Sequence, residues 1–120
     1  MILLQTATAN NITVTLKEKQ TLETPYFLFV FNYEADDTIQ YAIILSDLSS
    51  YTYRYNMFTL NLPTDIDIKT AGDYEYRIFE QTSDSNIDPD LADNLLETGK
   101  MRLKETSTTI TSSTNNYYVP

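Results

Sequence analysis

The sequence predicts an all-β domain in which two antiparallel sheets pack against each other. Runs of β-forming residues recur about every 10 to 15 residues, and several alternate apolar with polar side chains. Only one segment has a helical pattern, and no internal repeat of about 20–50 residues is visible. A chain of 120 residues can form one core. We therefore expect a two-sheet sandwich over residues 1–105 and an extended C-terminal arm over residues 106–120.

The first half of the chain supplies four of the predicted strands. Residues 1–5 predict a short strand, residues 6–11 a loop, and residues 12–16 a strand with alternate apolar side chains. Residues 26–31 are apolar at every position, which is typical of a central strand covered on both faces. A short acidic loop separates them from residues 39–45, so we expect these two runs to form a hairpin.

The next strand is predicted within residues 51–62. Its first part carries tyrosines on alternate positions, namely Tyr51, Tyr53 and Tyr55. Its second part carries three apolar side chains on one face, namely Phe58, Leu60 and Leu62. Pro63 should end the strand, because proline has no N–H to donate to a ladder.

A helical turn and a further strand are predicted before the arm. Asp88 and Pro89 suit the N-cap and first position of a helix, so we expect one or two helical turns within residues 88–96. The apolar stripe of these turns would be Leu91, Leu95 and Leu96. Residues 97–105 predict the last long strand, with Gly99 at a bulge or tight bend. The core-facing side chains of that strand are expected to be Met101 and Leu103.

The most regular alternation lies in residues 70–81, TAGDYEYRIFEQ, and predicts a half-buried strand. In immunoglobulin-type sandwiches, a tyrosine near the start of strand F bonds back to the preceding loop, and Tyr74 stands in that context. Thr70 and Tyr76 replace the usual aspartate and cysteine, and the chain has no tryptophan for strand C. We therefore expect an Ig-like variant of the sandwich, with Tyr74 as a structural corner.

Composition argues against several kinds of chemistry. The chain has no cysteine and no histidine, which removes disulfides, thiolate nucleophiles, the usual zinc ligands and imidazole catalysis. Two glycines are too few for a glycine-rich phosphate loop. No spacing among the 17 acidic residues singles out a catalytic carboxylate pair. We expect a protein that is not an enzyme, with no catalytic residues and no cofactor.

The charge and hydropathy of the chain restrict its partners. A net charge of −9 argues against nucleic acid and anionic membranes. No run approaches the ~20 apolar residues of a membrane span. Residues 1–4 are too short for the apolar region of a signal peptide. We expect a soluble protein made without a cleaved export signal.

One acidic segment has the outline of a calcium loop. Residues 84–90 carry side-chain oxygens at every second position. Pro89 stands where such loops have glycine, and Leu95 stands where they have glutamate. The favoured interpretation is that these Asp and Asn side chains make local turn and cap bonds, so no metal site is predicted.

Two sets of side chains are candidates for contacts with other proteins. The first set consists of Tyr51, Tyr53 and Tyr55. Tyrosine suits interfaces, so this set could form a protein- or sugar-binding face, or it could simply cover an exposed sheet. The second set lies in the polar arm and consists of Ile110, Tyr117, Tyr118 and Val119. The arm is either disordered or adds a strand to a sheet edge of a neighbouring subunit.

Several phrases along the chain resemble one protein family when they are taken together. They are residues 24–32 (TPYFLFVFN), residues 50–60, residues 72–81 and residues 86–101. Their order is similar to that in small structural proteins of tailed phages of Bacteroidetes hosts, including the crAss-like phages. The resemblance covers roughly residues 24–103, and its motifs are structural rather than catalytic.

The resemblance implies a structural component of a virion. The expected role is a capsid-associated or head-fibre-anchoring domain that acts through protein–protein contacts. Its partners would be other virion proteins (capsid, fibre or tail subunits) and further copies of itself, and it would be made in the host cell cytoplasm. The alternative function is a carbohydrate-binding or adhesion module that uses the tyrosine-rich face.

Overall fold

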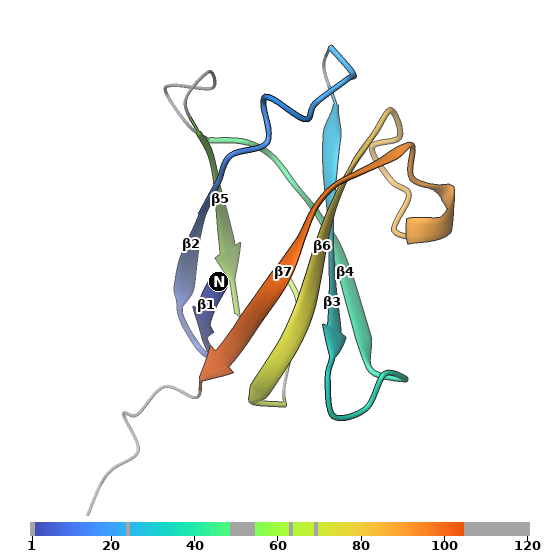
Figure 1. The fold of residues 1–120 in the computed structure, drawn as a ribbon. Coiled ribbons are helices and arrows are strands. Elements are labelled where there is room, and N and C mark those ends of the chain that lie inside the picture. The colour runs from blue at the N-terminus through green and yellow to red at the C-terminus, as the bar shows by residue number, and fades with distance from the viewer. Residues whose placement is uncertain (1, 24, 49–54, 63, 69, 105–120) are drawn as a thin grey trace, which may run out of the picture.

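The computed structural model describes residues 2–23, 25–48, 55–62, 64–68 and 70–104. The elements among them are β1 (Ile2–Gln5), β2 (Ala9–Val14), β3 (Tyr26–Tyr33), β4 (Gln40–Leu45), β5 (Asn56–Asn61), β6 (Gly72–Gln81), the 3-10 turn η1 (Pro89–Leu91) and β7 (Asn94–Lys104). Five strands form one sheet in the order β1-β7-β6-β3-β4, and β2 pairs with β5 in a second, smaller sheet (Figure 1). The all-β prediction is confirmed for the described residues.

The prediction of purely antiparallel sheets is wrong at one edge, where β1 pairs parallel to β7. The chain leaves β1 through a tight turn, in which Ala7 has a φ of 56°, and enters the other sheet at Ala9. The predicted loop over residues 6–11 is therefore too long. Asn10 joins the two sheets, because its amide donates to the carbonyls of Gln5 at 3.0 Å and Leu60 at 3.3 Å.

Strand β3 lies in the interior of the five-stranded sheet, between β6 and β4, as its uniformly apolar sequence predicts. Its alternate side chains enter two different clusters. Phe27, Phe29 and Phe31 belong to the main core, whereas Leu28 and Val30 lie on the opposite face. The predicted hairpin is also present, since β3 and β4 pair antiparallel with Phe27 opposite Leu45.

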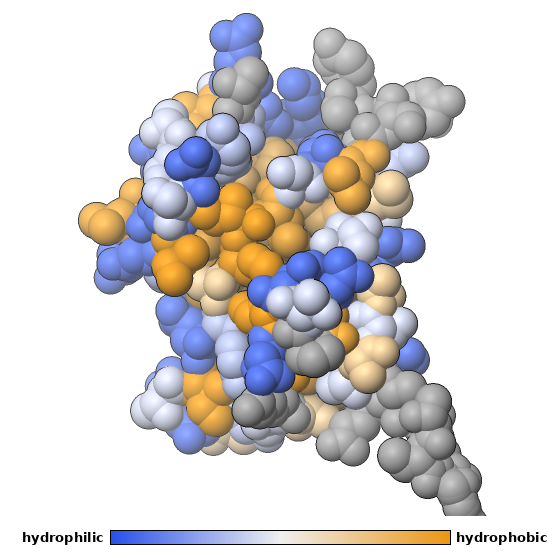
Figure 2. Space-filling view, turned by 180° about the vertical axis from the view of Figure 1, so that it is seen from behind, coloured by the Kyte–Doolittle hydropathy of each residue, from blue (hydrophilic) through white to orange (hydrophobic). Residues whose placement is uncertain are grey.

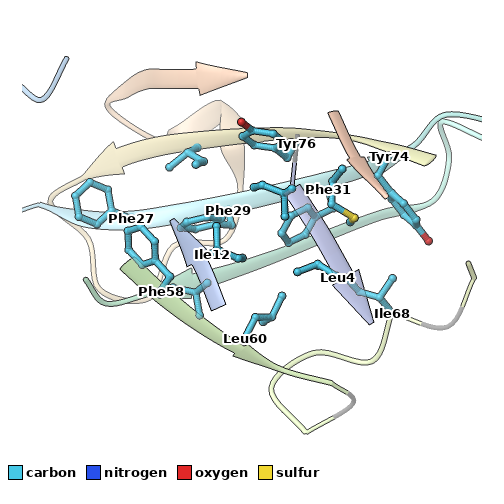
Figure 3. Packing of buried hydrophobic residues seen from close by; sticks show 14 of the residues in the cluster. Leu4, Ile12, Phe27, Phe29, Phe31, Phe58, Leu60, Ile68, Tyr74 and Tyr76 are labelled. Carbon is cyan, nitrogen blue, oxygen red and sulfur yellow. The ribbon is translucent and has the colours of Figure 1, made fainter. Parts of the chain in front are cut away.

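The main core lies between the two sheets (Figure 3). Phe58 on β5 connects the two sheets at the centre of this core. Its ring makes edge-to-face contacts with the rings of Phe27 and Phe29 on β3, at centroid distances of 5.5 Å and 4.8 Å. The expected core-facing side chains Leu60, Leu62, Met101 and Leu103 are all buried. One continuous apolar core therefore connects both sheets.

The predicted helical turns over residues 88–96 are mostly wrong. Asp88 does cap a turn, and its side chain accepts from the backbone N–H of Asp90, but the turn ends at Leu91. Strand β7 begins at Asn94, because this stretch pairs with the end of β6 instead of coiling. Of the three predicted stripe residues only Leu96 is buried; Leu91 and Leu95 are exposed.

Gly99 has a different role from the predicted bulge. It pairs regularly with Tyr76, and the ladder is instead irregular between Ile78 and Phe79. A Cβ atom at Gly99 would lie only 2.7 Å from the Tyr76 ring. Glycine at this position therefore allows the Tyr76 ring to lie flat against the neighbouring strand.

Strand β5 begins later than the tyrosine alternation predicts. Its first residue is Asn56, and Tyr55 precedes it as a half-buried side chain. Asn56 itself is buried. Its amide donates to Asp47 at 2.6 Å and its oxygen accepts from the backbone N–H of Leu16 at 2.9 Å. Tyr51 and Tyr53 lie outside the described residues.

Candidate functional site

Three connections leave the sheets at one end, which we call the loop end (Figure 1). They join β2 to β3, β4 to β5, and β6 to β7. The ladder places them together, because Tyr26 at the start of β3 pairs with Gln81 at the end of β6, and Phe27 pairs with Leu45 at the end of β4.

The opposite end, which we call the arm end, is where β7 finishes. Gly72 at the start of β6 pairs with Leu103, and β7 ends one residue later at Lys104. The predicted arm over residues 106–120 lies outside the described residues. The described chain therefore has its three long connections at one end of the sheets and the end of its last strand, Lys104, at the other.

A buried carboxylate organises the loop end. Glu80 is fully buried and faces inward on β6. Its oxygens accept from the backbone N–H groups of Thr21 at 3.0 Å and Leu22 at 3.1 Å, from the Thr21 hydroxyl, and from the Asn94 amide at 2.8 Å. Burial raises the pKa of Glu80, whereas these hydrogen bonds lower it. The hydrogen bonds together have the larger effect, so the pKa of Glu80 lies below the ordinary glutamate value. Glu80 thus ties the β2–β3 connection to β6 and β7.

A shallow pocket of about 210 Å³ also opens at the loop end. It lies between the β2–β3 connection and the segment around the start of β5. The residues that line it are Lys17, Gln20, Glu23, Pro25, Phe27, Asp47 and Asn56. The lining therefore combines amide, charged and apolar groups.

Tyr74 forms the corner that the sequence predicts. The side chain is buried and its hydroxyl donates to the carbonyl of Thr70 at 2.5 Å. Burial, followed by the neighbouring Tyr41 and Tyr33, raises the pKa of Tyr74 to about 12, so the hydroxyl remains a donor at neutral pH. Gly72 lies between the two partners with a φ of +140°, a conformation that other residues rarely adopt.

Replacement of Tyr74 by Phe should lower the free energy of unfolding by about 0.5–1.5 kcal/mol, because one hydrogen bond is lost while the ring remains. Thermal and urea unfolding of the purified domain would measure this loss. Tyr33→Phe is a suitable control, since it removes a hydroxyl from the same ring cluster and leaves the Tyr74–Thr70 bond in place. Equal stability of Tyr74→Phe and the parent would show that the corner contributes nothing.

The other predicted contact residues are mostly beyond the part of the chain that the structure describes. This applies to Tyr51, Tyr53, Ile110, Tyr117, Tyr118 and Val119. Tyr55, the remaining member of the first set, is half-buried beside the start of β5. The structure therefore leaves the tyrosine face and the arm contacts as predictions.

The acidic segment over residues 84–90 uses its side chains for local bonds. Asn86 accepts from the N–H of Asp88 at 3.0 Å, and Asp88 accepts from the N–H of Asp90 at 2.9 Å. Within the described ranges, no group of three acidic side chains could hold a metal ion together. Local turn and cap bonds therefore account for two of the four alternating positions, Asn86 and Asp88.

The outer face of the five-stranded sheet carries ion pairs near the arm end. Arg102 Nε lies 2.8 Å from Asp73 Oδ1, and Lys100 Nζ lies 2.5 Å from Glu34 Oε2. The hydrogen bond to Arg102 lowers the pKa of Asp73. These groups are largely exposed, so such pairs contribute little to stability. In each pair the two charged groups neutralise one another. A shallow pocket of about 230 Å³ lies between the pairs.

Sequence analysis did not single out Glu80, although a signal for it exists. Glu80 follows Tyr74, Tyr76 and Ile78 at the period of a strand, so it is an ionisable residue on a face that is otherwise apolar. A carboxylate in that position must find donors when it is buried. The identity of those donors depends on Thr21 and Leu22, which are far away in the sequence.

Comparisons with known proteins identified no relative of this chain. No protein-family model matches the chain, and neither the curated proteins nor the solved structures contain a match. Among the described residues, no helix has the length and apolar character needed to cross a membrane.

Proposed function

We propose that this chain is an Ig-like domain. Strands β7, β6, β3 and β4 would correspond to G, F, C and C′ of the immunoglobulin fold, and β2 and β5 would correspond to B and E. The hydrogen bond from Tyr74 to Thr70 supports this correspondence, since it lies at the start of the F-like strand. The usual cysteine pair and the tryptophan of strand C are replaced by Phe29, Tyr76 and other apolar side chains of the core.

We further propose that the domain is a structural component of a virion and not an enzyme. The observation that carries this proposal is that β7 finishes, at Lys104, at the opposite end of the sheets from the three long connections. An arm at one end can attach the domain to a particle, while the loop end faces outward. The resemblance of residues 24–103 to structural proteins of tailed phages supports a capsid-associated or head-fibre-anchoring role. The protein would be made in the host cytoplasm and incorporated during assembly.

The proposed attachment is strand addition. Strands β1 and β4 are the edges of the five-stranded sheet, so each has backbone groups that no strand of this chain pairs among the described residues. The threonine-rich arm of a neighbouring subunit could pair with such an edge, with Ile110 and Val119 as apolar contacts. Copies of the chain would then form a homo-oligomer on the particle.

Deletion of residues 106–120 tests the attachment. The truncated domain should unfold at the same temperature as the full chain, because the arm follows the last described strand, which ends at Lys104. It should nevertheless be missing from assembled particles, which mass spectrometry of purified particles would show. A variant that keeps the arm and carries Glu75→Gln, an exposed change on the interior strand β6, is the control. Normal incorporation of the truncated chain would contradict the proposed role of the arm.

Carbohydrate binding is the second candidate function. The polar pocket beside Asp47 and Asn56 favours it, because the segment that carries Tyr51, Tyr53 and Tyr55 adjoins this pocket in the chain. Binding to a glycan array that is lost when all three tyrosines are replaced by alanine would support this function. Lack of binding to any glycan on the array would count against it.

A further inference from the structure

Three large apolar side chains of the β6–β7 connection and the start of β7 are exposed. Ile87 is 60% exposed, Leu91 is 72% exposed and Leu95 is 52% exposed. We call these three residues the β6–β7 patch. Single exposed leucines are common on protein surfaces, but three within nine residues of one connection are a feature that needs a cause.

The patch is carried by a connection that hydrogen bonds hold in one conformation. The Gln81 amide donates to the carbonyl of Asn86 at 2.8 Å, and the Asn86 amide donates back to Gln81 Oε1 at 2.9 Å. The N–H of Thr82 donates to Asp93 at 2.8 Å, which closes the connection across its base. An ordered connection presents its side chains without a large loss of entropy when a partner binds.

The connection partly buries a small side chain and leaves the larger ones in solvent. Ala92 packs on the outer cluster formed by Leu28, Val30 and Phe79. Leu91, the last residue of the 3-10 turn, is exposed. Hydrophobic burial within the chain would favour the opposite arrangement. Figure 2 shows hydrophobic surface at the left margin, where η1 lies in this view, bordered by hydrophilic side chains.

The charged side chains of the segment that carries the patch have one sign. The segment over residues 82–95 contains Asp84, Asp88, Asp90 and Asp93, and it contains no lysine or arginine. Asp84 and Asp90 are exposed. A two-fold contact between copies of this chain would bring the same acidic groups together, so a second copy is disfavoured at this surface.

We propose that the β6–β7 patch is a docking surface for a partner protein's helix whose apolar face is bordered by lysine or arginine side chains. Ile87, Leu91 and Leu95 pack against the apolar face, and the aspartates meet the basic borders. The surface lies at the loop end, opposite the end at which β7 finishes at Lys104. This assignment stands on the described residues alone and does not depend on the virion role.

A defined peptide tests the proposal. The probe is an amphipathic helix of about 14 residues with leucines on one face and lysines along both borders. Two control peptides replace either its leucines with serine or its lysines with glutamate. Titration of the ¹⁵N-labelled full chain should shift amide signals of residues 82–95. The dissociation constant should rise at least about tenfold in Leu91→Ser and in Asp90→Lys, and change by less than about twofold in Leu3→Ser.

Leu3→Ser is a matched control, because Leu3 is 63% exposed but lies on β1 in another part of the sheet. Each of the following outcomes would overturn the proposal. The serine peptide could bind as tightly as the leucine peptide, the shifts could map outside residues 82–95, or Leu3→Ser could weaken binding as much as Leu91→Ser. Self-association that Leu91→Ser abolishes in sedimentation experiments would instead assign the patch to a second copy.

Discussion

Replacement of Phe58 by Ala is expected to lower the free energy of unfolding by about 3–5 kcal/mol. Phe58 is fully buried, and its ring contacts Phe27 and Phe29 on the five-stranded sheet. The substitution removes apolar contacts and also leaves a cavity between the sheets, because β2 and β5 can close it only partly. The part of the small sheet that the structure describes has two strands, so a loss at its centre weakens its attachment as a whole.

Denaturant unfolding followed by circular dichroism would measure this loss. For a domain of this size, the melting temperature should fall by roughly 15–30 °C. Phe58→Leu gives a graded second variant that keeps the site apolar and should cost about 1 kcal/mol. Leu3→Ala is the control, since an exposed side chain should change stability by less than about 0.5 kcal/mol. Similar stability for Phe58→Ala and Leu3→Ala would contradict the central position of Phe58.

The parts of the fold that follow from local pattern were predictable from the sequence. The continuous apolar run over residues 26–31 identifies an interior strand, because only a strand covered on both faces keeps apolar side chains in both directions. The alternation after Gly72 identifies β6 and places Tyr74 beside its own preceding turn. Both features depend on residues that are close together in the chain.

The parts that depend on distant partners were not predictable. The parallel pairing of β1 with β7 joins the two ends of the domain, and nothing within residues 2–5 indicates a partner at Met101. Leu91, Leu95 and Leu96 have helical spacing, but pairing with β6 from Asn94 onward is the stronger constraint. The result exposes Leu91 and Leu95, which local spacing assigned to a buried stripe.

The candidate site shows the same division. The corner at Tyr74 was predicted, because its partner Thr70 lies four residues away. The donors to Glu80 and the exposure of the β6–β7 patch were not predicted, because each depends on how the connections pack at the loop end. Tyr55 was predicted as part of a strand, whereas β5 starts at Asn56. Tyr51 and Tyr53 lie outside the described residues.

Loss of the Glu80 carboxylate should be the second large effect on stability. Glu80→Ala leaves the N–H groups of Thr21 and Leu22 and the amide of Asn94 without their common acceptor. A hydrogen bond to a charged group contributes about 1.5–3 kcal/mol, and unsatisfied buried donors add a cost, so we expect a loss of about 3 kcal/mol. Glu80→Gln keeps the shape of the side chain and one acceptor oxygen, although its amide N–H₂ then faces other donors. The loss of stability in Glu80→Gln should therefore be smaller than in Glu80→Ala.

Unfolding of both variants and the parent in urea at pH 7 would measure these losses. Glu75→Gln is a matched control on the same strand, because Glu75 is exposed on the opposite face of β6. Hydrogen exchange gives a second readout. The amides of Thr21 and Leu22 should lose protection in both Glu80 variants and keep it in Glu75→Gln. Unchanged protection of these two amides in Glu80→Ala would refute the role of Glu80 in holding the β2–β3 connection.

The pH dependence of stability should separate the charge of Glu80 from its shape. The folded pKa of Glu80 lies below the ordinary value of 4.5, because hydrogen bonds from Thr21, Leu22 and Asn94 outweigh the effect of burial. The unfolded chain therefore binds a proton at a higher pH than the folded chain does. The carboxylate contributes its full stabilisation above about pH 4.5, and this contribution is lost as the pH falls through the folded pKa.

The stability difference between the parent and Glu80→Gln should consequently be constant near neutral pH and shrink below pH 4.5. Asp36 and Asp73 also have lowered pKa values, but both are present in the two proteins, so their titration cancels in the difference. Urea unfolding at a series of pH values from about 7 to about 3 would trace the difference. A difference that stays constant down to pH 3 would mean that the hydrogen bonds do not depend on the charge of Glu80.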